Sequence, residues 1–268
     1  MSGTTTVSPV GTRIAEANRD RAGALIGYLP VGFPTLEQSV DAAVALVENG
    51  VDVLELGLPY SDPVMDGPVI QRATQTALEN GFRLRDAFTA VEAIRSRVDA
   101  PILLMTYWNP VVQYGVDRFA DDLVSAGGAG LITPDLTVDS GRDWLAASDR
   151  TGLDRVFLAA PTSTAERLEL AVTNSRGFVY VVSTMGVTGA RSDVDVSART
   201  LVDRLRAAGS TSACVGIGIS TGDQVAEVLE YADGAIVGSA LVRALSDDGV
   251  QGVAKVAASL AAGTARSL

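Results

Sequence analysis

Short apolar runs recur along the chain, and each is followed by a segment with a different periodicity. The runs are rich in β-branched residues, whereas the intervening segments repeat apolar residues every three to four positions, as amphipathic helices do. Strand followed by helix, eight times over, is the pattern of a (β/α)₈ barrel. The expected strands cover 24–29, 51–57, 101–106, 129–132, 155–160, 178–183, 213–218 and 234–238.

Capping signals support this division. Thr35 precedes Gln38 by three residues and Thr221 precedes Gln224 by three, the spacing of a helix start. We also expect an N-terminal helix before the first strand and a short extra helix at 239–245 after the eighth. Helical spacing is clearest at 39–49, 84–98, 116–126, 165–173 and 221–229.

Chain length agrees with the barrel. The 268 residues match the roughly 250 of one such domain. We therefore expect a single domain over 1–268, with 1–8 poorly ordered. An open, doubly wound parallel sheet has the same alternation of strands and helices and is the competing fold.

Composition excludes several classes of function. The net charge of −11 disfavours binding to nucleic acid or to an anionic membrane. The chain has no histidine, one lysine (Lys255) and one cysteine (Cys214). Histidine-ligated metals and Ser-His-Asp triads are thereby excluded, and we expect no metal site. No run is long and apolar enough for a membrane span, and the start does not resemble a signal peptide, so we expect a cytoplasmic protein.

Glu55 lies in an apolar run that would otherwise be a buried strand. A carboxyl group there costs several kcal/mol unless it is solvated or paired. Burial would raise its pKa towards neutrality, which suits a group that donates and accepts protons. A structural carboxylate bonded to the backbone or to an arginine is the alternative.

The loop 58–67 after the second expected strand combines prolines with two aspartates. Asp66 can fold back towards Glu55, and two carboxyls in different environments can take different protonation roles. Asp62 precedes a proline and can be simple turn chemistry.

Three glycine-rich turns follow the last three expected strands, at 186–189, 216–220 and 237–240. In barrels, backbone N–H groups of the loops after strands seven and eight, with a short extra helix, often bind phosphate. We therefore expect a phosphate-bearing ligand. The loop 184–196 reads as a mobile lid, with a plain connector as the alternative. Tyr28 and Tyr180 sit in apolar strands and, if they face the barrel mouth, can flank a planar substrate.

The segment from Glu55 to Pro68, ELGLPYSDPVMDGP, strongly resembles the signature of the tryptophan synthase alpha subunit. The resemblance covers essentially the whole chain, because further motifs fall in family order. These motifs are GYLPVGFP at 27–34, MTYWNP at 105–110, STMGVTG at 183–189, GIGIS at 216–220 and VGS at 237–239.

The resemblance implies a (β/α)₈ lyase that cleaves indole-3-glycerol phosphate into indole and glyceraldehyde 3-phosphate by a retro-aldol reaction. By motif match, Glu55 is the acid-base and Asp66 accepts a hydrogen bond from the indole N–H. Tyr28 lies where the family places an aromatic ring against the indole, and Tyr180 matches a family residue beside the reacting centre. Thr188 is the lid residue that meets Asp66. The phosphate site matches Gly189, Gly218, Gly238 and Ser239.

The resemblance also implies a partner, the beta subunit, to which indole passes in an alpha2beta2 heterotetramer with allosteric coupling. Pyridoxal phosphate belongs to that subunit, so no cofactor is expected in this chain. The partner-facing residues are Pro59, Asp62, Asn109 and Pro110. Departures from the family pattern occur at Pro30, Phe33 and Met185.

Two other functions fit parts of the pattern. A different phosphate-binding barrel, such as an isomerase or the synthase one step upstream, would share the glycine turns, although the upstream chemistry generally calls on a lysine acid. A non-catalytic barrel that only activates a partner is the second, and the intact candidate acids argue against it.

Overall fold

Nine parallel strands form one sheet in the computed structural model, which describes the backbone of residues 7–182 and 191–266. The strand order is β5-β4-β3-β2-β1-β9-β8-β7-β6, and every pairing is parallel. The strands are β1 (Ala24–Pro30), β2 (Val53–Gly57), β3 (Ile102–Met105), β4 (Gly130–Ile132), β5 (Asp154–Val156), β6 (Leu158–Ala159), β7 (Val179–Val182), β8 (Ala213–Gly216) and β9 (Gly234–Val237).

The two end strands of this order, β5 and β6, are separated in the chain by Phe157 alone, so the sheet closes on itself. The (β/α)₈ barrel is thereby confirmed, and the open doubly wound sheet is wrong. The expected strand 155–160 is not continuous, however. The Phe157 N–H donates to the Ser175 hydroxyl (3.3 Å) rather than to a strand carbonyl, while the Phe157 carbonyl accepts from Tyr180 N–H (3.0 Å).

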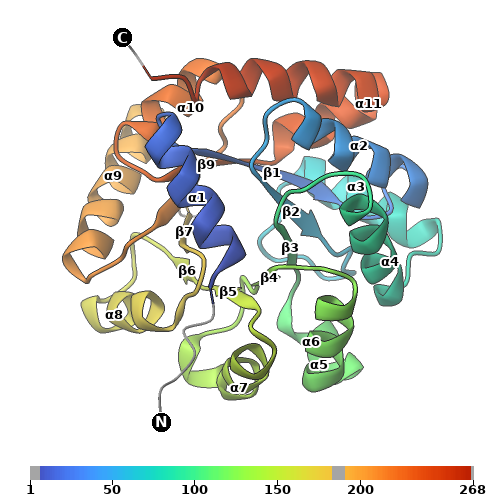
Figure 1. Ribbon diagram of the computed structural model, residues 1–268, viewed down its shortest axis with the longest axis horizontal. Coiled ribbons are helices and arrows are strands. Elements are labelled where there is room, and N and C mark those ends of the chain that lie inside the picture. The colour runs from blue at the N-terminus through green and yellow to red at the C-terminus, as the bar shows by residue number, and fades with distance from the viewer. Residues whose placement is uncertain (1–6, 183–190, 267–268) are drawn as a thin grey trace.

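Helices surround the strands (Figure 1). The Thr35 and Thr221 hydroxyls accept from the backbone N–H groups of Gln38 (3.2 Å) and Gln224 (3.3 Å), which confirms both caps. The helices are α1 (Pro9–Asp20), α2 (Leu36–Glu48), α3 (Pro68–Glu79), α4 (Leu84–Arg95), α5 (Trp108–Tyr114), α6 (Val116–Ser125), the 3₁₀ turn η1 (Val138–Ser140), α7 (Arg142–Thr151), α8 (Ala165–Asn174), α9 (Arg191–Ala207), α10 (Gly222–Leu229) and α11 (Ser239–Ala262).

Two apolar cores fill the molecule. The outer core lies between strands and helices and includes Leu54, Leu56 and Trp144. The inner core fills the barrel with residues such as Ile26 and Val53. This division explains why the strands read as nearly continuous apolar runs: both of their faces are covered.

Helix α1 closes one end of the barrel, as its position across the strands in Figure 1 shows. Val10, Ile14 and Ala17 on α1 pack into the inner core. The buried Asp154 carboxylate accepts from the Ser8 hydroxyl (2.8 Å) and from Val10 N–H (3.1 Å). Ser8 in turn accepts from Gly11 N–H (2.8 Å), so it caps the helix. The opposite end, where the strands finish, is left for a site.

Two sequence expectations need correction. Helix α9 begins at Arg191, so 191–196 are helical and do not belong to a loop at 184–196. The rest of that proposed lid, with Met185, Gly186, Thr188 and Gly189, lies outside the described residues. The extra helix expected at 239–245 is the start of the longer α11, which changes direction at Gly249, where φ is +63°.

No helix in the described ranges is long and apolar enough to cross a membrane.

Candidate active site

Glu55 projects into the barrel from the middle of β2. Its neighbours Leu54 and Leu56 belong to the outer core, so strand alternation turns Glu55 inwards. The residue is 1% exposed, and within the described structure its Oε2 atom has no hydrogen-bond partner. Burial, with a smaller contribution from the charge of Asp66, raises the pKa of Glu55 to about 8. Glu55 is therefore a neutral acid at pH 7 with an unpaired oxygen inside the barrel.

Tyr28 and Tyr180 lie close enough to Glu55 to interact with its charge. Tyr28 pairs in register with Glu55 on the neighbouring strand, and Tyr180 lies on β7. Burial raises the pKa of both hydroxyls well above the usual value, and the charge of Glu55 acts on both. Two buried tyrosines therefore neighbour the acid.

Glycines on adjacent strands provide the space for these rings. A Cβ atom on Gly57 would lie 2.2 Å from the Tyr28 hydroxyl, and one on Gly216 would lie 2.9 Å from the Tyr180 hydroxyl. Any larger residue at either position would displace a ring. Gly57 of β2 was not singled out in the sequence, where it reads as an ordinary strand end, and Gly216 of β8 was noted there only as the start of the turn at 216–220.

Asp66 lies on the loop between β2 and α3, half-buried beside Glu55. Burial raises the pKa of Asp66, and its charge acts on both Glu55 and Tyr28. The structure therefore brings together the two carboxyl groups that the sequence paired. A neutral acid and a second, more solvated carboxyl can take different roles at one pH.

Tyr107 holds the loop that carries Asp66, a role that the sequence did not reveal. The Tyr107 hydroxyl accepts from Met65 N–H (2.8 Å), and its ring stacks on Tyr60 with centroids 5.1 Å apart. Burial raises the pKa of Tyr107, and the charge of Asp66 adds to this. The sequence shows only that Tyr107 is an aromatic residue just after a strand. It does not show which loop the Tyr107 side chain contacts.

Gly218, Gly238 and Ser239 all lie where strands β8 and β9 lead into helices. Gly218 is exposed with φ of +80°, and a Cβ there would meet nothing within 4 Å. Gly238 precedes α11 as its N-terminal cap, and Ser239 is the first, exposed residue of that helix. These backbone groups can receive an anion at a helix N-terminus. Thr188 and Gly189 lie outside the described residues.

The residues that we expect to face a partner differ in their exposure to solvent. Asp62 and Asn109 are exposed and Pro110 is half-buried, whereas Pro59 is buried within this chain. The Asn109 amide donates to the Tyr60 hydroxyl (3.5 Å). Three successive strand-end loops are joined here, because Asp135 also accepts from Trp108 N–H (2.9 Å) and so caps α5.

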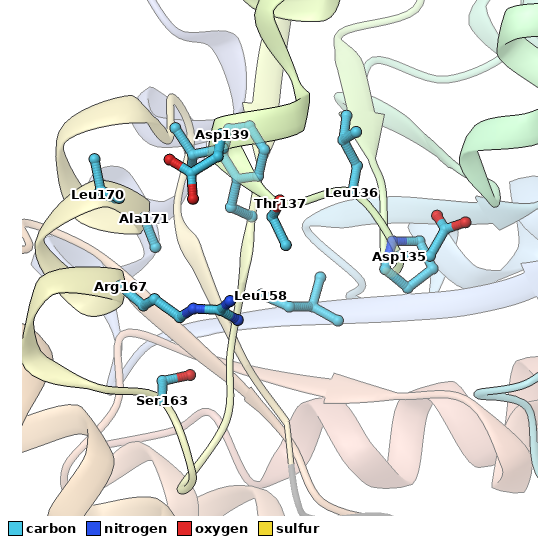
Figure 2. Close-up of a pocket in the computed structure, with 12 residues that line it drawn as sticks. Asp135, Leu136, Thr137, Asp139, Leu158, Ser163, Arg167, Leu170 and Ala171 are labelled. Carbon is cyan, nitrogen blue, oxygen red and sulfur yellow. The ribbon is translucent and has the colours of Figure 1, made fainter.

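A separate pocket of about 160 Å³ lies beside the interrupted strand, between the β4–α7 connection and α8. Figure 2 shows the Arg167 side chain reaching across it towards Leu158. Neither Glu55 nor Asp66 lines this pocket, so it is distinct from the carboxyl pair. In the part of the chain that the structure describes, no group of three or more acidic, histidine or cysteine side chains is arranged to hold a metal ion.

The fold and the site define a class of protein. It is a (β/α)₈ barrel, an architecture common among enzymes, and it holds a neutral glutamic acid, a second carboxyl and two tyrosines, groups that are capable of acid-base chemistry.

Comparison with known proteins gives the family. Residues 14–266 match the family profile described as "Tryptophan synthase alpha chain". A relative of that name from Leifsonia xyli subsp. xyli is 71% identical over 97% of this chain and 100% of its own. A solved tryptophan synthase structure from Mycobacterium tuberculosis is 51% identical with a TM-score of 0.92, covering 97% of this chain and all of that one. The tryptophan synthase complex from Pyrococcus furiosus gives 34% identity and a TM-score of 0.81, covering 90% and 98%.

The chain belongs to the tryptophan synthase alpha chain family. It is a lyase of tryptophan biosynthesis, and its reaction is the cleavage of indole-3-glycerol phosphate to indole and glyceraldehyde 3-phosphate.

Proposed function

We propose that Glu55 is the acid-base of this cleavage. The observation that carries the proposal is a buried carboxyl with a pKa of about 8 and a free oxygen, on the inner face of a barrel strand. Such a group is protonated at neutral pH and can donate its proton to carbon. An ordinary surface glutamate would already be ionised.

One carboxyl group can carry both proton transfers of the reaction. Glu55 gives its proton to the indole ring carbon that bears the side chain, which turns the ring into an indolenine-like cation. The bond from that carbon to the side chain then breaks, and its electron pair restores the aromatic ring. The side-chain hydroxyl loses its proton and becomes the aldehyde, and the Glu55 carboxylate accepts that proton. Glu55 ends the cycle protonated.

Asp66 stabilises the positive charge on the ring in this scheme by accepting a hydrogen bond from the indole N–H. Its position beside Glu55 supports this role, because the charge of Asp66 acts on Glu55. Tyr28 and Tyr180 flank the planar ring system. The phosphate group binds to backbone N–H groups at Gly218, Gly238 and Ser239, with Thr188 and Gly189 completing the site on closure.

The remaining proposals concern the cellular setting. We propose that the chain acts as one domain in the cytoplasm, with a beta subunit in an alpha2beta2 heterotetramer that receives the indole. Pyridoxal phosphate is held by that subunit alone. The joined loops after β2, β3 and β4 support a docking face around Asp62, Asn109 and Pro110 with Pro59 beneath, because they also expose Val64 (76%) and Val112 (48%).

Replacing Glu55 with Gln tests the catalytic assignment. Indole release from indole-3-glycerol phosphate, measured in the presence of a metal chelator, should fall by about 10²–10⁴-fold. Glu48→Gln on the exposed side of α2 is the control and should keep full activity. Turnover retained in Glu55→Gln would refute the role of Glu55, and loss of wild-type turnover with chelator would refute the metal-free scheme.

Light scattering of the chain mixed with a beta subunit tests the assembly. A mass of two chains of each kind is expected, with a higher rate of indole formation than for this chain alone. Asp62→Ala with Asn109→Ala should weaken the complex without lowering the basal rate. Masses that correspond to the separate, unassociated chains would contradict the partner proposal.

A further inference from the structure

A cleft of about 430 Å³ lies between α3 and α11, and neither Glu55 nor Asp66 lines it. Facing stripes of the two helices form its walls, with Arg72 and Thr76 on α3 and Arg243 and Ser246 on α11. Phe33, from the connection after β1, lies at the same cleft. Two guanidinium groups and two hydroxyls therefore surround one opening.

The two arginines occupy equivalent places. Arg72 is the fifth residue of α3 and Arg243 the fifth of α11, one turn from each helix start. Both helices begin at the carboxyl ends of the barrel strands, the end at which Glu55 and Asp66 lie. The cleft therefore lies between two helices that start at the end of the barrel where the strands finish, and the positive ends of both helix dipoles point towards that end.

Neither guanidinium is neutralised by the protein. Among the described residues, Arg72 and Arg243 have no ion pair and no side-chain hydrogen bond, although most arginines in the same range have one or the other. Asp247 also lines the cleft but lies beyond ion-pair distance of both. In a chain with a net charge of −11, this leaves an isolated positive site of two arginines against one carboxylate.

We propose that this cleft binds a phosphomonoester dianion, held between Arg72 and Arg243 with the Ser246 hydroxyl as a further donor. Like charges facing one another across a cleft repel, and a dianion between them converts that repulsion into two attractions. Guanidinium groups suit phosphate because their planar N–H donors match its oxygens in pairs. A hydroxyl donor completes the tetrahedral set of partners.

The ligand has two possible sources with the same chemistry. It is either the phosphate group of the substrate, captured before it reaches the helix start at Ser239 one turn away on the same helix, or a separate phosphate-bearing metabolite. Capture of the substrate would raise its local concentration at the mouth, an effect that weakens as salt screens the charges. The proposal does not depend on the roles of Glu55 and Asp66.

Titration calorimetry with inorganic phosphate tests the site directly. The wild-type chain should bind one phosphate more than the Arg72→Gln/Arg243→Gln variant, whether or not the helix start at Ser239 also binds inorganic phosphate. Arg85→Gln is the matched control, because Arg85 is an exposed arginine of α4 without an ion pair and outside the cleft; it should bind as many phosphates as the wild type. An equal number of phosphates in the wild type and the double variant overturns the proposal. Because no turnover is needed, this result is separate from any failure of the catalytic assignment.

Kinetics identify the source. If the substrate is captured, the double variant should show a KM for indole-3-glycerol phosphate raised by about 3- to 10-fold with kcat unchanged, and a weaker dependence of KM on salt. If the double variant binds one phosphate fewer than the wild type while its KM and the salt dependence of KM stay at the wild-type values, the site serves a separate phosphate ligand. Equal KM values together with an unchanged phosphate stoichiometry refute both.

Discussion

At the scale of single residues, Glu55 shows how catalysis and stability oppose one another. The unfolded chain ionises this carboxyl near its ordinary pKa of 4.5, whereas the folded chain holds the proton up to about pH 8. Between these values the unfolded state binds fewer protons, so the free energy of unfolding falls as pH rises. The destabilisation reaches its full size above pH 8, and the pKa difference sets an upper limit of about 5 kcal/mol.

Glu55→Gln should therefore stabilise the fold in a pH-dependent way. We expect the variant to match the wild type near pH 4.5 and to exceed its free energy of unfolding by a few kcal/mol at pH 8, because glutamine has no proton to lose. Urea unfolding at several pH values measures this. A constant difference between the two proteins across the range would mean that Glu55 has no raised pKa, and Glu48→Gln controls for loss of a surface carboxyl.

Glu55 should set the alkaline limit of activity, and Asp66 should shift it. If Glu55 must start protonated, kcat/KM falls tenfold per unit as pH rises beyond about 8. The Asp66 charge helps to raise the pKa of Glu55, so its removal in Asp66→Asn should move this limit to lower pH while also lowering the rate. The pH profile of residual indole release measures both effects. A limit that stays in place would show that the carboxyls do not interact.

At the residue scale, the sequence points to a candidate where a side chain conflicts with its local pattern. Glu55 stands out because a carboxyl interrupts an apolar strand, and Asp66 because it lies in a rigid loop eleven positions later. Tyr107 and Asp154 did not stand out. Both act through partners far along the chain, Met65 and Ser8, and such pairing follows from the closed barrel rather than from local pattern.

At the scale of elements, loop 58–67 is fixed by its neighbour, because Tyr107, between β3 and α5, accepts from the backbone of Met65 next to Asp66. Tyr107→Phe removes the acceptor and leaves that N–H unsatisfied. We expect kcat to fall by about 3- to 10-fold, with little change in the melting temperature, since a looser loop positions Asp66 less well.

Tyr114→Phe is the control for this variant. The Tyr114 hydroxyl donates to Asp122 (2.5 Å) on the outer surface, so its loss removes one side-chain hydrogen bond away from the site. Steady-state kinetics of both variants separate the two cases. Equal rates would show that the Tyr107 hydroxyl does not position the loop.

Element boundaries were predictable where capping residues mark them, as at Thr35 and Thr221. They were missed where hydrogen bonds from elsewhere decide the outcome. The strand at 155–160 is interrupted because Ser175, from the segment before β7, takes the Phe157 N–H. The start of α9 was missed for another reason. Its charged and polar residues resemble a loop in the sequence, although they form a helix from Arg191.

At the scale of the whole molecule, the barrel separates stability from chemistry along its axis. The end closed by α1 is held by the Ser8, Val10 and Asp154 hydrogen bonds, whereas Glu55 and Asp66 lie towards the other end. This is the usual division in such barrels, where one face serves stability and the other carries function. Changes at the two ends should therefore act independently.

Ser8→Ala tests this independence. It removes the cap of α1 and the donor to Asp154, and it should lower the free energy of unfolding by about 1 kcal/mol while leaving kcat and KM unchanged. Combined with Glu55→Gln, the two changes in unfolding free energy should add to within about 0.5 kcal/mol, because the residues share no partner. Urea unfolding of the single and double variants at pH 8, together with indole release by Ser8→Ala, provides the measurement. A larger coupling, or a slower Ser8→Ala enzyme, would mean that the packing of α1 into the inner core reaches the acid at the far end of the barrel.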